Sequence, residues 1–352
     1  MALANIGNDQ LKWETVTRLS LGMDMSLWQN RLNLSFNYYK SFVDHMLTLK
    51  TLGGVSGLRN YWSNDGKMEN QGFDISVTAK VLALKDFSWE ISAGLGHYKN
   101  EVTALPDGDK PVYTSLYGGE VVTQVGGPVG LFYGYKTQGV FSTSEDAAFA
   151  GLRDGRADGD VFRGGDMHFA DLVADGVIDE KDKTVIGDPN PDIFGNFGTS
   201  LHYKNWTLNA FFSYSLGNDI YNYQRAVLEG GSTYYNQTTA VLNRWTSEGQ
   251  VTEIPRAELG DPMGNSRFSD RWIEDGSYLK LKTLSLSYRI PFNYTFLQGI
   301  TVWAAANNVF TCTKYLGSDP ELSISSSAVG QGIDRGLLGR GRSFVLGVKI
   351  NL

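Results

Sequence analysis

The stretch RLSLGMDMSL, residues 18–27, places leucine or methionine at every odd position and a polar residue or glycine at every even position. A similar alternation returns in residues 32–38, 87–96, 206–214, 300–306 and 344–352. A period of two sends successive side chains to opposite faces of an extended chain. The pattern therefore predicts an all-β protein whose strands have one apolar face and one polar face.

Strand and loop lengths distinguish this chain from a soluble sheet. Several runs reach about ten residues, the length that crosses a bilayer at a tilt, whereas strands of soluble proteins average roughly five or six. Short turns are expected at 28–31, 83–86, 204–205 and 291–298, and long polar loops at 51–66, 143–191, 223–270 and 316–341. Short periplasmic turns and long extracellular loops are typical of an antiparallel transmembrane β-barrel. Such a sheet must close, because lipid offers the backbone no hydrogen-bond partner.

The direction of the strands gives an expected strand count. If the last strand runs towards the periplasm, the long loops must all be extracellular. Counting strands back from the end, the strand near 131–141 and the strand at 87–102 would then run in the same direction. One further strand, near 112–124, must therefore lie between them. The total becomes about eleven strands. An odd, open set of this size does not close as a bacterial single-chain barrel, so we expect residues 1–352 to be part of a larger barrel.

Composition excludes several other classes of protein. The formal net charge of −7 and the lack of a basic stripe argue against a nucleic-acid partner. Cys312 is the single cysteine, so no disulfide forms within the chain and a zinc–thiolate site is not expected. No sequence window approaches the roughly 18–20 apolar residues of a membrane-spanning helix.

Seven motifs in the chain resemble those of one family. They cover nearly the whole sequence in the order NDQLKWE (8–14), MENQGFD (68–74), FYGYKTQGVF (132–141), IGDPNP (186–191), GNDIYN (217–222), SYLKLK (277–282) and NVFTCTKYLGSDPE (308–321). On these residues the chain resembles SusC/RagA-like TonB-dependent outer-membrane transporters. One departure is Leu352, since barrels of this kind commonly end in an aromatic residue.

The resemblance implies a fold and a function. It implies that residues 1–352 form the C-terminal half of a 22-stranded barrel, and that the plug domain and the first half of the barrel lie elsewhere. It also implies nutrient uptake through the outer membrane, of oligosaccharide or peptide, without enzymatic activity. The implied partners are a SusD-like lipoprotein lid on the extracellular side, the TonB complex acting through the plug, and outer-membrane lipid.

Two other functions are compatible with the residues. The long loops carry aromatic residues beside amides and carboxylates, and these combinations suit sugars or peptides; the candidate ligand-binding residues are Tyr61, Trp62, Tyr234 and Tyr235. A secreted carbohydrate-binding β-protein would use the same loops. A glycoside hydrolase would need a carboxylate pair such as Glu180 and Asp182, although no spacing singles that pair out.

The segment DLVADGVIDEKD, residues 171–182, follows the pattern of an EF-hand loop. Calcium, the candidate cofactor, prefers several oxygen ligands, and glycine permits the sharp turn between them. The candidate ligands are Asp171, Asp175, Val177, Asp179 and Asp182. Val173 replaces one usual ligand, so a calcium-free turn held by side-chain hydrogen bonds is the alternative. The nearby Asp154, Asp158 and Asp160 are expected to lie in a solvated loop.

Overall fold

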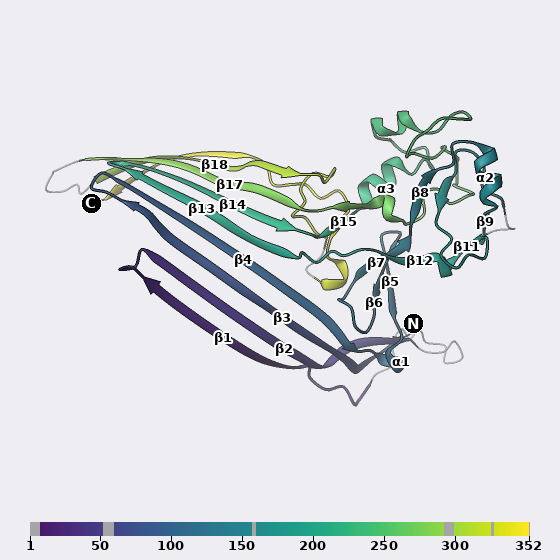
Figure 1. Cartoon of the computed structure of the whole chain (residues 1–352), viewed down its shortest axis with the longest axis horizontal. Coiled ribbons are helices and arrows are strands. Elements are labelled where there is room, and N and C mark those ends of the chain that lie inside the picture. Colours follow the sequence, from purple (N-terminus) through teal and green to yellow (C-terminus); the bar gives the residue numbers. More distant parts are fainter. Residues whose placement is uncertain (1–7, 52–59, 157–159, 292–298, 325–326, 352) are drawn as a thin grey trace, which may run out of the picture.

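The computed structural model describes residues 8–51, 60–156, 160–291, 299–324 and 327–351. Within them, nine antiparallel strands form one large curved sheet, in which the order in space follows the order in the chain (Figure 1). These strands are β1 (Thr15–Leu27), β2 (Leu32–Thr51), β3 (Asn60–Ala83), β4 (Phe87–Ala104), β13 (Ile193–Tyr203), β14 (Trp206–Leu216), β17 (Tyr278–Ile290), β18 (Gly299–Thr313) and β20 (Ser343–Asn351).

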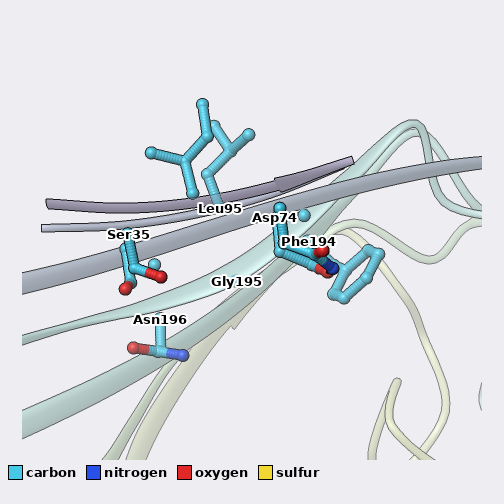
Figure 2. A pocket seen from close by; sticks show the side chains of 11 residues that line it. Ser35, Asp74, Leu95, Phe194, Gly195 and Asn196 are labelled. Carbon is cyan, nitrogen blue, oxygen red and sulfur yellow. The ribbon is translucent and has the colours of Figure 1, made fainter. Parts of the chain in front are cut away.

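The register of the large sheet sorts its side chains into two faces, as the alternation predicts. Ser35 of β2 pairs with Asp24 and Ser76, while its neighbour Phe36 pairs with Met23 and Ile75. Figure 2 shows Leu95 on one side of the sheet and Ser35 and Asn196 on the other. The apolar face has no cover within the described chain, since Leu21 is 60% and Leu346 83% exposed. Such a face suits contact with lipid.

Three of the four predicted short turns are confirmed, and they lie at one end of the large sheet. The β1–β2 turn contains three consecutive residues with positive φ, Trp28, Gln29 and Asn30. Lys204 also has positive φ in the β13–β14 turn. The fourth predicted turn, 291–298, lies outside the described residues except for residue 291. The long loops that follow β4, β14 and β18 lie at the opposite end of the strands (Figure 1). Of the long loop predicted at 51–66, residues 60–66 belong to β3 instead, and 52–59 lie outside the described residues.

The strand count differs from the prediction at two places. The segments near 112–124 and 131–141 do not join the large sheet. Their strands β5 (Val112–Leu116), β6 (Gly119–Thr123) and β7 (Leu131–Tyr135) form a separate four-stranded sheet with β12 (Lys183–Gly187). Each has only five residues, and β7 is buried along nearly its whole length instead of having one exposed face. Because β4 pairs with β13, the next strand of the large sheet, the described large sheet has nine strands rather than eleven. The described long loops still lie at one end of it.

The three longest loops, residues 105–192, 217–277 and 314–342, fold together into what we call the loop body. Its remaining elements are α1 (Pro106–Asp109), β8 (Thr137–Val140), α2 (Ser144–Ala150), β9 (Arg153–Asp154), β10 (Met167–Phe169), β11 (Val177–Ile178), η2 (Glu180–Asp182), β15 (Asp219–Asn222), α3 (Tyr223–Glu229), η3 (Thr239–Asn243), η4 (Asp270–Trp272), β16 (Ile273–Asp275), η5 (Ala328–Gly330) and β19 (Ile333–Asp334). None of the helices among the described residues is long and apolar enough to cross a membrane.

The two clusters of hydrophobic core residues in the described chain lie in the loop body. One cluster of buried side chains surrounds Phe162 and Phe169, and a second surrounds Phe132 and Trp272. The rings of Phe132 and Trp272 are completely buried. A core of this kind gives the long loops a fixed conformation, so they can hold side chains in place for binding.

Candidate functional site

The polar face of the large sheet contains a hollow of about 350 Å³ over β2, β3, β4 and β13 (Figure 2). Ser35, Asp74 and Asn196 line it together with glycines. A Cβ at Gly96 would come within 2.7 Å of the Phe194 ring, so glycine is needed there to admit the neighbouring side chain. This polar surface is the side of the strands that would face the inside of a barrel.

A second hollow, of about 320 Å³, lies in the loop body, and we call it the loop-body hollow. Its walls come from the β5–β6 hairpin, β7, η2, the start of β12 and the segment around Arg267. The residues that matter for its chemistry are Glu120, Tyr133, Tyr135, Arg156, Glu180, Lys183, Arg267 and Phe268. The sequence does not predict that these residues lie together, because they come from segments spread between residues 115 and 268.

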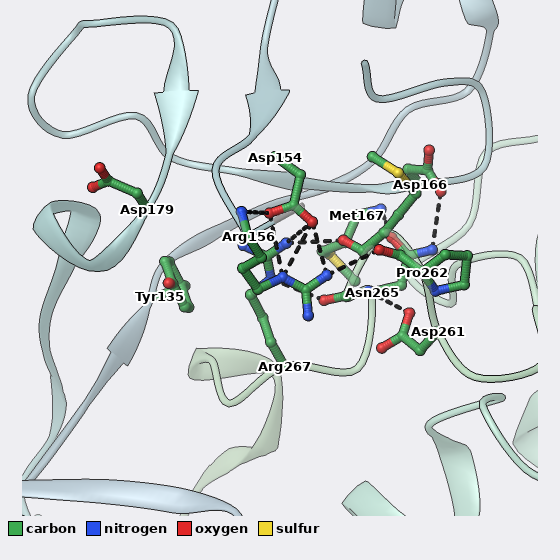
Figure 3. A network of polar contacts seen from close by, with 12 residues as sticks. Tyr135, Asp154, Arg156, Asp166, Met167, Asp179, Asp261, Pro262, Asn265 and Arg267 are labelled. Carbon is green, nitrogen blue, oxygen red and sulfur yellow. Dashed lines mark hydrogen bonds and ion pairs between the residues drawn. The ribbon is translucent and has the colours of Figure 1, made fainter. Parts of the chain in front are cut away.

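Two arginines share one carboxylate beside the loop-body hollow (Figure 3). Asp154 Oδ2 accepts hydrogen bonds from Arg156 Nη2 at 2.7 Å and forms an ion pair with Arg267 Nη2 at 3.2 Å. Burial raises the pKa of Asp154, but the hydrogen bonds from Arg156 and the charge of Arg267 outweigh burial and hold the pKa below its usual value. Asp154 therefore stays ionised inside the protein. It is 1% exposed, so the prediction that it lies in a solvated loop is wrong; Asp160 is exposed, and Asp158 lies outside the described residues.

Arg267 is held by aromatic rings as well as by charge. Its Cζ atom lies 5.0 Å from the ring centre of Tyr135 and 4.5 Å from that of Phe169. Its Nε and Nη2 donate to the carbonyls of Gly264 and Met263. Stacking and hydrogen bonding of this kind favour arginine over lysine at the position.

The other side of the loop-body hollow is acidic. Lys183 Nζ lies 3.0 Å from Glu120 Oε2 and 2.6 Å from Glu180 Oε2. Burial lowers the pKa of Lys183, but the hydrogen bonds to Glu180 and Glu120 outweigh it and raise the pKa above its usual value. Burial and a hydrogen bond with Tyr113 raise the pKa of Tyr133 to about 12. Lys183 is therefore protonated and the Tyr133 hydroxyl neutral at neutral pH.

The four aromatic residues predicted to bind ligand do not form one site. Tyr61 lines a polar hollow of about 760 Å³ with Asn64 and the segment 8–12. Trp62 follows Tyr61 on β3, so it points to the other face of that strand. Tyr234 and Tyr235 are 89% and 71% exposed in the loop after α3. No hollow or ring contact in the described chain joins the two pairs, and ligand binding by each pair stays a prediction.

The EF-hand-like loop is closed by its own hydrogen bonds. Asp171 accepts the backbone N–H groups of Ala174, Asp175 and Gly176. Asp182, which is fully buried, accepts those of Leu172 and Asp179. Lys181 Nζ lies between Asp175 and Asp179, at 3.6 and 3.4 Å, and the backbone N–H of Val177 donates to Asp175. Within the described ranges no three histidine, cysteine or acidic side chains are grouped as a metal site requires. The backbone N–H groups thus engage the carboxylates of Asp171 and Asp182, as the hydrogen-bonded turn requires, and calcium binding by the loop stays a prediction.

Calcium titration tests this loop directly. Because its carboxylates are engaged by backbone N–H groups, we expect calcium at about 1 mM, a concentration that fills weak extracellular sites, to shift the thermal midpoints of the wild type and of Asp175→Ala equally. A rise confined to the wild type would instead establish calcium binding at the residues predicted from the sequence.

The Glu180 and Asp182 side chains do not form a hydrolytic pair. Glu180 is engaged with Lys183, and Asp182 is fully buried as an acceptor of backbone N–H groups. A glycosidase needs two carboxyl groups that face the same scissile bond. The geometry therefore gives no support to the hydrolase alternative.

Asp219 of β15, in the loop body, is a carboxylate in an environment that disfavours its charge. Burial raises its pKa, and the charges of Asp188, Asp275 and Asp192 raise it further, although it accepts the backbone N–H of Asp188. Ionisation therefore costs more in the folded than in the unfolded state, and stability falls as pH rises through the raised pKa.

The variant Asp219→Asn is thus expected to raise the thermal midpoint at pH 7 and to have no effect well below pH 3.8, the ordinary pKa. Asp146→Asn is the matched control. Hydrogen bonds with Thr143 and Ser142 lower the pKa of Asp146, so its change should act in the opposite direction. Equal effects of the two variants at pH 7 would contradict the assignment.

A family model that matches most of the chain identifies the family. The model of the family described as "TonB dependent receptor-like, beta-barrel" matches residues 2–309. The chain belongs to this family. It is an outer-membrane TonB-dependent receptor β-barrel chain, which confirms the localisation and the fold class predicted from the sequence.

The relatives of this TonB-dependent receptor chain are longer than the chain itself. It is 34% identical over 365 residues to TonB-dependent receptor P3 of Formosa agariphila, a match that covers 99% of this chain and 35% of the relative. It is 26% identical over 360 residues to TonB-dependent receptor SusC of Bacteroides thetaiotaomicron, covering 97% and 32%. The chain therefore spans about a third of the length of these relatives.

Among solved structures, the TonB-dependent receptor chain is similar to that of the RagAB peptide transporter. The TM-score is 0.79 at 24% identity, and the match covers 98% of this chain and 36% of the other. This similarity shows that the large sheet and the loop body have the same fold in both proteins.

Proposed function

We propose that residues 1–352 act as the C-terminal part of a TonB-dependent importer that takes oligosaccharide or peptide through the outer membrane. The observation that carries the proposal is the family match over residues 2–309, combined with a sheet whose apolar face is exposed among the described residues. That face would contact lipid, and the polar face over β2, β3, β4 and β13 would line the route taken by the cargo.

The proposal includes partners that the chain itself does not supply. A plug domain and further strands would complete the barrel at the free edges of β1 and β20, because unpaired edge strands are a liability in water and are not tolerated in lipid. Energy would come from the TonB complex through the plug. A SusD-like lipoprotein lid would cover the loop body, and exposed apolar side chains there, such as Tyr234, Leu242 and Val251, support a protein contact.

Uptake by cells tests the proposal. Cells that lack residues 1–352 of the receptor are compared with the parent strain for removal of casein peptides and of starch oligosaccharides from the medium. We expect the deletion to slow the removal of one mixture, and we expect collapse of the proton gradient to have the same effect on the parent strain. Unchanged removal of both mixtures would contradict import. A detergent-free, monodisperse protein that binds glycans would support the secreted carbohydrate-binding alternative instead.

A further inference from the structure

The loop-body hollow has one acidic and one basic end, and Tyr135 lies between them. Lys183 Nζ is 5.7 Å from the Tyr135 ring centre, and Arg267 Cζ is 5.0 Å from it. Both ends therefore belong to one small site rather than to separate surfaces. Tyr133 and Phe268 add aromatic surface to the same lining.

The ion pairs leave charge unbalanced at each end. At the acidic end two carboxylates, Glu120 and Glu180, share the single ammonium of Lys183. At the basic end the reverse holds, since Arg156 and Arg267 share the single carboxylate of Asp154. Asp261, the next carboxylate, is engaged by the backbone of Asn265 and Ser266, and within the described ranges it forms no ion pair with either arginine.

The basic end also retains hydrogen-bonding capacity. Nη1 of Arg267, a side chain 7% exposed, has no hydrogen-bond partner in the described part of the chain. The Arg156 side chain is 43% exposed and lines the hollow, so an incoming group can reach it. A carboxylate is the group that matches a guanidinium in charge and geometry.

We propose that the loop-body hollow binds a zwitterion, an amino acid or the ends of a short peptide. The ligand carboxylate would lie at Arg156 and the ligand ammonium at Glu120 and Glu180. The volume of about 320 Å³ is at the lower end of about 300–1,000 Å³ for ligand sites, which limits the bound portion to one or two residues. The inference rests on the proposed import function in treating this ligand as cargo.

A neutral sugar would satisfy this hollow poorly. Its hydroxyl groups could accept and donate hydrogen bonds, but they would leave the excess charge at both ends uncompensated. Charged hydrogen bonds are roughly twice as strong as neutral ones. The charge pattern therefore selects peptides over oligosaccharides as the ligand class.

Calorimetric titration of the receptor, purified from outer membranes in detergent at the length the organism produces, tests the proposal. The probes are Ala-Ala, its N-acetyl form, its C-terminal amide and maltose. We expect Ala-Ala to bind, each blocked form to bind at least ten-fold more weakly, and maltose not to bind. A ten-fold change corresponds to about 1.4 kcal/mol, within the range of one charged hydrogen bond.

Substitutions in the lining test whether Ala-Ala binds in the loop-body hollow. Arg156→Gln should weaken Ala-Ala binding at least ten-fold, whereas Arg156→Lys should retain most of it. Glu120→Gln should weaken Ala-Ala but leave the N-acetyl form unchanged. Arg153→Gln is the matched control, because Arg153 is an exposed arginine close in sequence that does not line the hollow.

Equal binding of Ala-Ala and its amide, binding of maltose alone, no binding of any probe, or wild-type affinity in Arg156→Gln would each overturn the proposal. The titration needs no TonB complex, so its failure is separate from a failure of import. Binding of Ala-Ala without uptake by cells would refute the proposed import function but not the proposed binding in the loop-body hollow. Peptide uptake unaffected by Arg156→Gln would refute the hollow as a cargo site and leave the importer intact.

Discussion

The variant Asp154→Asn is expected to lower the stability of the loop body by about 3–5 kcal/mol, the usual cost of removing one partner from a buried ion pair. Asparagine keeps the shape of the side chain but removes the charge that two arginines share. Arg267, which is 7% exposed, would then remain charged among Tyr135, Phe169 and the rest of the first core cluster. Arg156 is partly exposed, so water compensates more of its loss.

Hydrogen exchange in detergent is the suitable measurement, because it resolves the loop body from the large sheet. Amides of β9, β11 and β10 should lose protection in Asp154→Asn, while those of β13 and β14 should keep it. Asp160→Asn is the control, since the Asp160 side chain is exposed and only its backbone carbonyl contacts Asp154. Protection equal to wild type in Asp154→Asn would show that the shared carboxylate does not hold the loop body together.

The large sheet could be predicted from the sequence because each of its strands lies between two contrasting environments. One face meets an apolar surrounding and the other a polar one, so a single strand such as residues 18–27 carries the whole pattern. The strands of the loop body do not lie between two contrasting environments, so their sequences do not alternate in this way. Strand β7 has buried side chains on both faces, and its continuous run LFYGY is the mark of a strand inside a core, which separates it from the alternating barrel strands.

The loop-body hollow could not be predicted because its charges are distant in the sequence. Asp154 and Arg267 are separated by more than a hundred residues, and Asp154 lies among glycines and aspartates that suggest a solvated loop. A sequence pattern reports local periodicity and spacing, whereas a buried ion pair is set by the packing of whole segments. For the same reason, the sequence could not show that the pair Tyr61 and Trp62 lies apart from the pair Tyr234 and Tyr235.

Two of the motifs that carry the family resemblance meet at the start of β17. Lys280, in the motif SYLKLK, is 2% exposed, and its Nζ lies 2.8 Å from both Asp319 and Glu321 of the motif at 308–321. Tyr278 of the same strand donates to Glu321. The two motifs therefore form one ion-pair latch that fixes the loop 314–342 to the rim of the large sheet.

The variant Lys280→Met should open this latch, with an expected loss of about 3–5 kcal/mol in the stability of the loop 314–342. The cause is Asp319, which is 5% exposed and would become a buried charge without a cation. Limited proteolysis and hydrogen exchange of residues 314–342 measure the effect. Lys282→Met is the matched control, because its ion pair in the described chain is with Glu321, which is 21% exposed against 5% for Asp319. Its loss should cost about 1 kcal/mol or less.

A second substitution separates loss of charge balance from loss of packing. Asp319→Leu in the background of Lys280→Met removes the unpaired carboxylate and replaces a buried ion pair with apolar groups, an exchange that is often neutral. We expect the double variant to recover most of the protection of the loop. If the double variant is as labile as Lys280→Met, the loop is held by contacts other than the latch. If Lys280→Met and Lys282→Met behave alike, the buried carboxylate is not the group that decides stability at this rim.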